Sequence, residues 1–284
     1  MRKFTRILAA TLIGAGLMFG AARAETLVDR AEVQQVDPVA RVMAAARVAD
    51  LMNVVVTEGA RHGMGLERSL FPGKGGGAWA SAVSAIQSPE RLIPMIGNAL
   101  RERLSEEDAT RVAAFLGGDL GARIVAREVD VRRRLLTGGG ERQSMSRSSE
   151  TKGDRPALIE EMIRRLDLLD SNVLGGLNAN LAFYRGLGDG GALQKRLTER
   201  EMIAMVRGQE EGVRQSMMTW LRDYMTLAYQ PFTEDELRRY IAFAETDAGR
   251  RYTSAMFAGF GAVFERTSYD LGQAAARFIA HEAI

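Results

Sequence analysis

The stretch FTEDELRRYIAFAETDAGRRYTSA, from Phe232 to Ala255, decides the fold. Thr233 and Glu236 form a capping box, in which the hydroxyl and the carboxylate satisfy free backbone N–H groups at a helix start. An apolar stripe with helical spacing follows: Leu237, Tyr240, Ile241 and Ala244. After a tight corner at Thr246 and Asp247, we expect Asp247 to cap a second helix. The stripe of that helix is Tyr252, Met256, Phe260 and Val263.

The same unit recurs 128 positions earlier, from Leu104 to Ala126. Unrelated windows of this length share roughly one or two identical residues. The shared positions here are Glu106, Arg111, Ala114, Phe115, Asp119, Gly121 and Arg123, which match Glu234, Arg239, Ala242, Phe243, Asp247, Gly249 and Arg251. A second match lays Ala40–Leu70 on Ala157–Leu187 at an offset of 117, and pairs Arg47 with Arg164. We therefore expect an ancient duplication that yields two related helical bundles.

One part of the chain resembles a known family. An aromatic helix with Trp220 and Tyr224 precedes FTEDEL (Phe232–Leu237) and IAFAETDAG (Ile241–Gly249). This pattern resembles the bacterial envelope domain of unknown function numbered 2059, best over about 215–264.

The resemblance is fainter in the first copy, at 104–126, and it is divergent in the second. The family typically has Tyr and Pro at the positions where this chain has Ala244 and Ala248. What the resemblance implies is a secreted or periplasmic helical domain. It implies no reaction, cofactor or catalytic residue.

Residues 1–24 have the three parts of a secretory signal peptide. Basic residues (Arg2, Lys3 and Arg6) precede an apolar run, and an A-x-A site ends at Ala24. We expect cleavage after Ala24 and a location in the periplasm of a Gram-negative cell. An uncleaved anchor is the alternative, but the apolar run of about 15 residues is shorter than the roughly 20 of a spanning helix.

Composition excludes several kinds of partner and chemistry. The signal holds four of the 38 Lys and Arg and none of the 36 Asp and Glu, so the mature chain is near neutral and no global field favours nucleic acid. The chain has no cysteine, which excludes disulfides, thiol nucleophiles and cysteine metal sites. The remaining length is enough for one large or two small cores.

The domain prediction follows from these features. After the signal peptide (1–24) we expect a flexible leader (25–37), a first helical repeat (38–136), a Gly/Ser-rich linker (137–154) and a second repeat (155–284). The stripes predict long helices from Pro38 to about Leu66, from Pro156 towards Tyr184, and from Glu199 to about Tyr229. Asp37 is the predicted cap of the first, and Thr198 with Glu201 forms a capping box before the third. Gly175 and Gly176 within the second of these predict a kink or a close helix crossing.

Residues that carry chemistry are few. The two histidines, His62 and His281, lie far apart in sequence and are expected at the surface. Acidic clusters at 106–108 and 234–236 lie in the first turns of helices, where the dipole favours negative charge. The glycine run at 71–77 lacks the spacing of a phosphate-binding loop, which favours a connector. No catalytic, cofactor or metal site is predicted.

Three consecutive arginines end the first repeat. Arg132, Arg133 and Arg134 suit the negative end of a helix dipole, and they are also candidates for contact with an anionic surface such as lipid headgroups or wall polymer.

Absent catalytic groups and abundant helical faces favour a non-enzymatic envelope protein. It would bind a protein partner or an apolar ligand, either between its halves or in a groove lined by methionine and aromatic residues. The alternatives are an envelope hydrolase that uses carboxylate chemistry and a purely structural envelope component.

Overall fold

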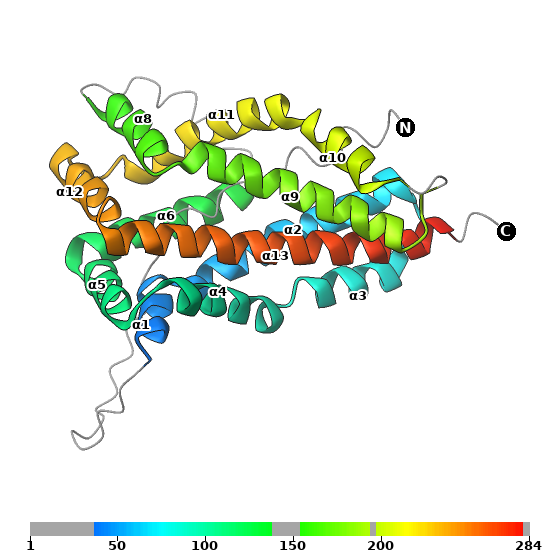
Figure 1. Cartoon of the computed structure of the whole chain (residues 1–284), viewed down its shortest axis with the longest axis horizontal. Helices are drawn as coiled ribbons and strands as arrows, with labels where there is room; N and C mark the ends of the chain where they lie inside the picture. Colours follow the sequence, from blue (N-terminus) through cyan, green and yellow to red (C-terminus); the bar gives the residue numbers. More distant parts are fainter. Residues whose placement is uncertain (1–36, 138–153, 194–196, 281–284) are drawn as a thin grey trace, which may run out of the picture.

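The computed structural model describes residues 37–137, 154–193 and 197–280, and Figure 1 shows their arrangement. Every regular element in these ranges is a helix, so the predicted all-α class is confirmed. The helices before the predicted linker are α1 (Pro38–Ala45), α2 (Val48–Leu70), α3 (Gly76–Ile86), α4 (Pro89–Arg103), α5 (Glu106–Gly117) and α6 (Asp119–Thr137). Those after it are α8 (Arg155–Arg165), α9 (Leu168–Asp189), α10 (Glu199–Arg207), α11 (Glu210–Tyr229), α12 (Glu234–Ala244) and α13 (Asp247–Ala280). The predicted signal peptide, most of the leader and most of the linker lie outside the described residues.

The helix starts predicted from capping residues are confirmed. Thr233 and Glu236 form a capping box at the start of α12, and Thr198 and Glu201 form another at the start of α10. Asp37 caps α1, since its carboxylate accepts a hydrogen bond from a backbone N–H of the first turn at 2.9 Å. These signals are local, so the sequence alone carries them.

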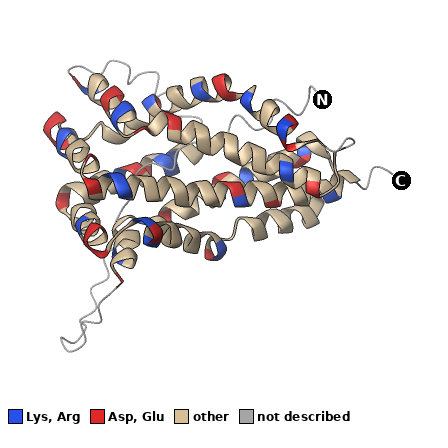
Figure 2. Cartoon of the chain, viewed as in Figure 1, with Lys and Arg blue, Asp and Glu red and all other residues tan. Residues whose placement is uncertain are grey.

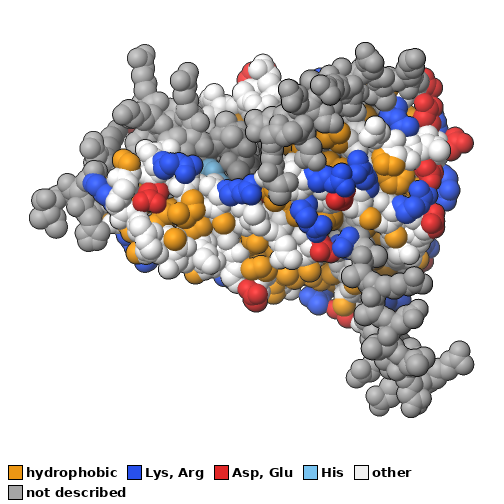
Figure 3. All heavy atoms as spheres, turned by 180° about the vertical axis from the view of Figure 1, so that it is seen from behind, with side chains coloured by type: hydrophobic (Ala, Val, Ile, Leu, Met, Phe, Trp, Pro, Cys, Tyr) orange, Lys and Arg blue, Asp and Glu red, His pale blue; other side chains and the backbone are white. Residues whose placement is uncertain are grey.

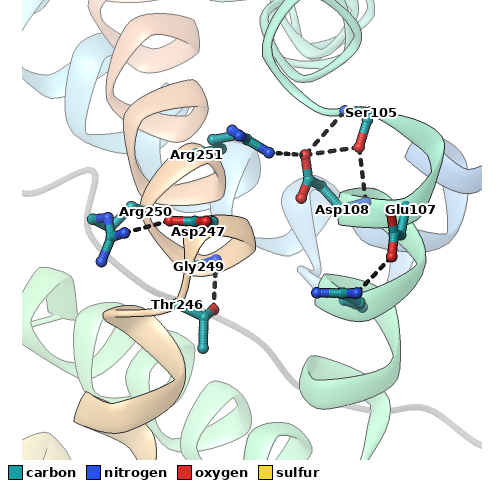
Figure 4. A network of polar contacts seen from close by, with 9 residues as sticks. Ser105, Glu107, Asp108, Thr246, Asp247, Gly249, Arg250 and Arg251 are labelled. Carbon is teal, nitrogen blue, oxygen red and sulfur yellow. Dashed lines mark hydrogen bonds and ion pairs between the residues drawn. The ribbon is translucent and has the colours of Figure 1, made fainter.

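The predicted cap of α13 is wrong by one residue. Thr246, not Asp247, caps this helix: the Thr246 hydroxyl accepts a hydrogen bond from the backbone N–H of Gly249 at 3.0 Å (Figure 4). Asp247 is the first helical residue and pairs with Arg250 across the first turn. Its negative charge therefore still lies at the positive end of the helix dipole.

The three long helices predicted from apolar stripes are each broken once. Two breaks fall at Arg47 (φ 36°) and Asp167 (φ 51°), the described non-glycine residues with a left-handed backbone. These two corners lie 120 positions apart, so the predicted register, which paired Arg47 with Arg164, is wrong by three residues here. The third break separates α10 from α11 at Gly208. The corners could not be predicted because the apolar spacing continues across them without interruption.

Helix α13 runs through the middle of the molecule, with α9 packed along it on one side and α4 and α3 on the other (Figure 1). Its 34 residues correspond to about 50 Å at 1.5 Å per residue. Glycines allow α9 and α13 to approach closely, because a Cβ atom on Gly272 would overlap the carbonyl oxygen of Phe183, and one on Gly186 that of Tyr269. No helix crosses closely at Gly175, where a Cβ would meet no atom within 4 Å, whereas Gly176 is buried.

The hydrophobic cores combine both halves of the chain. The first core holds residues of α1, α2, α4 and α5 together with Tyr252 and Phe260 of α13. The second holds residues of α8, α9, α11 and α12 together with Ile124 of α6. A third core lies around Trp79 and Phe71, between α2, α3, α9 and α13. The predicted linker at 137–154 thus does not separate two independent cores.

Two ion pairs connect the halves reciprocally. Arg251 on α13 binds Asp108 in the capping box of α5, with a nitrogen–oxygen distance of 2.7 Å (Figure 4). Arg123 on α6 binds Glu236 in the capping box of α12. Asp108 and Glu236 lie 128 positions apart, as do Arg123 and Arg251. Arg123 of the first half therefore contacts the α12 capping box of the second half, and Arg251 of the second half makes the equivalent contact with the α5 capping box of the first.

Candidate functional site

An open groove lies between α9 on one side and α10 and α11 on the other, along the top of Figure 1. Its volume is about 600 Å³. Small-molecule sites in proteins typically measure about 300–1,000 Å³. The groove therefore has the size of a ligand site.

The two walls of the groove run in opposite directions. Asp170 near the start of α9 binds Arg214 of α11 at 2.5 Å. Further along α9, the Asn180 amide donates to the Gln209 side chain at 2.9 Å. Arg185, near the end of α9, pairs with a glutamate at the start of α10. The start of α9 therefore faces α11, and its end faces α10.

Apolar and polar side chains both line the groove. The apolar lining residues are Val173, Leu174, Leu177, Leu181, Ile203 and Val206. Leu174 is 60% exposed and Ile203 is 37% exposed, and Met64 is the other large hydrophobic residue that is exposed in the described ranges. Isolated exposed apolar residues are common on proteins, whereas two that share one concavity indicate a binding surface.

One end of the groove is polar. Asp167, Asp170, Glu210 and Arg214 line it. The hydrogen bond that the Arg214 guanidinium donates to Asp170 raises the pKa of Arg214, and the charges of Asp170, Glu210 and Glu211 add to this effect. Elsewhere acidic and basic residues are interspersed along the helices (Figure 2).

A second candidate is a buried polar cluster between α6, α11, α12 and α13. Glu128 of α6 is 0% exposed, and one of its carboxyl oxygens accepts a hydrogen bond from the Tyr229 hydroxyl at 2.5 Å. The Tyr224 hydroxyl donates to the backbone carbonyl of Glu128 at 3.2 Å. Tyr240 and Tyr252 are also buried. Burial raises the pKa of Glu128 well above its ordinary value, so we expect its carboxyl group to be neutral.

The structure corrects the prediction for Arg132, which is only 1% exposed and cannot contact an anionic surface. Its guanidinium binds the carboxylate of Glu58, with nitrogen–oxygen distances of 2.5 and 3.2 Å. It also lies over the ring of Trp220, 5.6 Å from the ring centroid. Arg132 therefore belongs to the interior.

Arg133 and Arg134 lie at the surface. The Arg133 guanidinium is 3.7 Å from the carboxylate of Asp50, and that of Arg134 is 2.8 Å from Asp130. Basic side chains are frequent on the face turned away from Figure 1, where apolar side chains lie between them (Figure 3). Contact of this face with an anionic surface stays a prediction.

The other predicted residues do not form a site. His62 is half-buried, which corrects the expected surface position, and burial lowers its pKa. His281 lies outside the described residues. The acidic clusters lie in first helical turns as predicted, where Asp108 and Glu236 bind arginines. Within the described ranges, no group of three His, Asp or Glu side chains is placed to hold a metal ion.

The predicted methionine stripe belongs mainly to the cores. Met217 is buried in the second core, and Met202 and Met205 pack against the third. Leucine, isoleucine and valine line the groove instead. None of the helices in the described part is long and apolar enough to cross a membrane.

None of the residues that line the groove was predicted from the sequence as part of a site. The one relevant signal is Gly175, which follows Leu174 directly in α9 and has open space where a side chain would lie. Comparison with family models, with curated proteins and with solved structures gives no match for this chain.

Proposed function

We propose that this protein is a non-enzymatic binding protein of the bacterial cell envelope, and that it holds an apolar small molecule in the groove between α9 and α10–α11. The observation that carries the proposal is the exposure of Leu174 and Ile203 inside one concavity of about 600 Å³. Burying a leucine-sized side chain against a ligand is worth roughly 1.5–3 kcal/mol. An apolar ligand that covers these side chains therefore gains binding free energy from the removal of apolar surface from water.

A small molecule fits the groove better than a protein partner does. Stable protein interfaces bury roughly 800 Å² on each partner. The exposed apolar surface here is concentrated on two side chains inside a concavity, Leu174 and Ile203. This arrangement is typical of a ligand cleft and not of a broad docking face.

The location rests on residues 1–24, whose basic start, apolar run and A-x-A site support export and cleavage after Ala24. On the basis of this signal we propose periplasmic residence in a Gram-negative cell. The resemblance of residues 215–264 to the envelope domain of unknown function 2059 points to the same compartment.

We also propose that the two halves arose by duplication. Six described helices on each side of the linker follow one another in a similar order of lengths. Contacts across the halves are reciprocal as well: α13 packs on α4 and α5, and α6 packs on α11 and α12. Isologous contacts of this kind are those of a two-fold symmetric dimer.

An envelope hydrolase remains the alternative from another class. It would need a carboxylic acid with a raised pKa beside a second carboxylate, both within reach of the substrate. Glu128 has the raised pKa, but it is fully buried among tyrosines. Asp170 faces the groove, but its carboxylate is paired with Arg214. The geometry therefore favours binding without catalysis.

Native mass spectrometry of the protein purified from its own periplasm tests this proposal. We expect a bound small molecule in the wild-type spectrum and its loss in the variant Leu174→Arg, which places a long charged side chain in the groove. A wild-type protein that is always empty, and that takes up no apolar compound when one is added, would overturn the proposal.

A further inference from the structure

We infer that the ligand is an amphiphile with a cationic head group and an apolar tail. This inference rests on the proposed function, because it names the class of molecule that the same groove takes. It is argued from the order in which charged and apolar side chains follow one another along the two walls.

The polar end of the groove has more carboxylates than cations. Asp167, Asp170 and Glu210 line it, whereas Arg214 is the cation there. Arg214 is already bound to Asp170 at 2.5 Å, and it lies 3.9 Å from Glu210. The carboxylate of Asp167 accepts a hydrogen bond from the Ser171 hydroxyl at 3.2 Å, and no cation of the described residues forms an ion pair with it. A cation at this end would therefore meet net negative charge.

The apolar end lies further along α9. Leu174, Leu177 and Leu181 follow the acidic residues at successive turns of this helix, and Ile203 faces them from α10. The distance from Asp167 to Leu181 along the helix is about 20 Å at 1.5 Å per residue. An extended alkyl chain with a charged head can thus lie along the groove with its head among the carboxylates.

Arg207 is the residue that opposes this assignment. It lines the groove next to Val206, between the two ends, and carries the same charge as the inferred head group. If the head group were anionic, Arg207 would be its natural partner. The sign of the effect of an Arg207 substitution therefore separates the two assignments.

The experiment compares dodecyltrimethylammonium with dodecyl sulfate, both below their micelle concentrations, by isothermal titration calorimetry on the full mature chain. We expect the ammonium compound to bind more tightly, by about fivefold, as a partly exposed charge contact of up to about 1 kcal/mol allows. Tighter binding of the sulfate, or equal affinity for both, would overturn the inference.

Substitutions at the polar end test whether the preference for the ammonium compound over the sulfate arises in the groove. We expect Asp170→Asn and Glu210→Gln each to lower the affinity for the ammonium compound about two- to fivefold. We expect Arg207→Gln to raise this affinity. Glu107→Gln is the matched control, because Glu107 is in a similarly exposed ion pair, with Arg111 on α5. Loss of affinity in Arg207→Gln, or an equal loss in the control, would contradict the inference.

Failure of the inference and failure of the proposed function give different results. A neutral apolar dye, N-phenyl-1-naphthylamine, reports on the groove without a head group. If the dye binds and Leu174→Arg prevents this, the groove is a site even when the charge preference is absent. If neither the dye nor either dodecyl compound binds, the proposed function itself is wrong.

Discussion

Phe115 of α5 and Phe243 of α12 lie 128 positions apart and stack face to face, with ring centroids 3.7 Å apart and ring planes 5° from parallel. Equivalent residues contact one another in this way when a two-fold axis passes between them. The pairs Arg123–Glu236 and Arg251–Asp108 connect the same two halves of the chain. These contacts lie at the end of the molecule where α5 and α12 meet (Figure 1), and they support the proposed duplication.

The pair Arg123–Glu236 gives a prediction about pH. A hydrogen bond from Arg123, together with the capping bonds at Thr233, lowers the pKa of Glu236 to about 2. Because the folded pKa lies below the ordinary value of 4.5, the stability that this carboxylate contributes is present above about pH 4.5 and is lost as the pH falls towards 2.

The variant Arg123→Met should raise the pKa of Glu236 towards 4.5, without restoring it fully, because the capping bonds at Thr233 persist. A carboxyl-carbon NMR titration measures this directly. Arg111→Met is the matched control, since Arg111 pairs with Glu107 within α5 and does not contact Glu236. An unchanged pKa of Glu236 in Arg123→Met would show that the contact between the halves does not form.

The buried Glu128 gives a prediction of opposite sign. Its folded pKa is raised, so the stability linked to its proton is full below about pH 4.5 and declines as the pH rises towards the folded pKa. Glu128→Gln keeps the acceptor for the Tyr229 hydroxyl and removes this titration. Over that window the stability of the wild-type protein should fall relative to the variant by up to about 1.4 kcal/mol per pH unit.

Urea unfolding of both proteins between pH 4 and pH 8 measures this difference. We expect the two curves of unfolding free energy to separate as the pH rises, with Glu128→Gln the more stable protein at pH 7. Parallel curves would mean that Glu128 is ionised in the folded protein and has a charge partner.

The close crossing of α9 and α13 predicts contrasting effects of two glycine substitutions. Gly272→Ala places a methyl group against the carbonyl oxygen of Phe183 and should cost about 1–3 kcal/mol of unfolding free energy. Gly175→Ala meets no atom within 4 Å and should stabilise α9 by about 0.5–1 kcal/mol. Chemical denaturation measures both values, and equal effects would place the crossing elsewhere.

Local signals in the sequence predicted much of this fold. The capping boxes at Thr198 and Thr233 fixed two helix starts, because a cap needs only residues within one turn. The stripe through Tyr252, Met256 and Phe260 identified the buried face of α13, because burial follows the helical period. The all-helical class follows from these two kinds of signal.

Features that depend on contacts between distant segments could not be predicted. The corners at Arg47 and Asp167 have no glycine or proline to mark them. Glu128 and Arg132 are charged residues that sequence rules place at the surface, yet tyrosines and Trp220 from α11 and later helices cover them. Leu174 is the reverse case. A leucine in an apolar helix is expected in the core, but the packing of α10 and α11 against α9 leaves Leu174 exposed in the groove.

The central claim is that the groove at Leu174 binds apolar molecules, and titration with N-phenyl-1-naphthylamine, followed by fluorescence, tests it most directly. The variants to compare are Leu174→Arg in the groove and Met64→Arg, which places the same charge on an exposed apolar residue of α2 that does not line the groove. We predict that Leu174→Arg lowers the affinity for the dye about tenfold or more, because a loss of about 1.4 kcal/mol of apolar contact corresponds to a tenfold change. Met64→Arg should change the affinity less than about twofold. Equal binding by the wild-type protein and both variants, or no binding by any of them, would contradict the account.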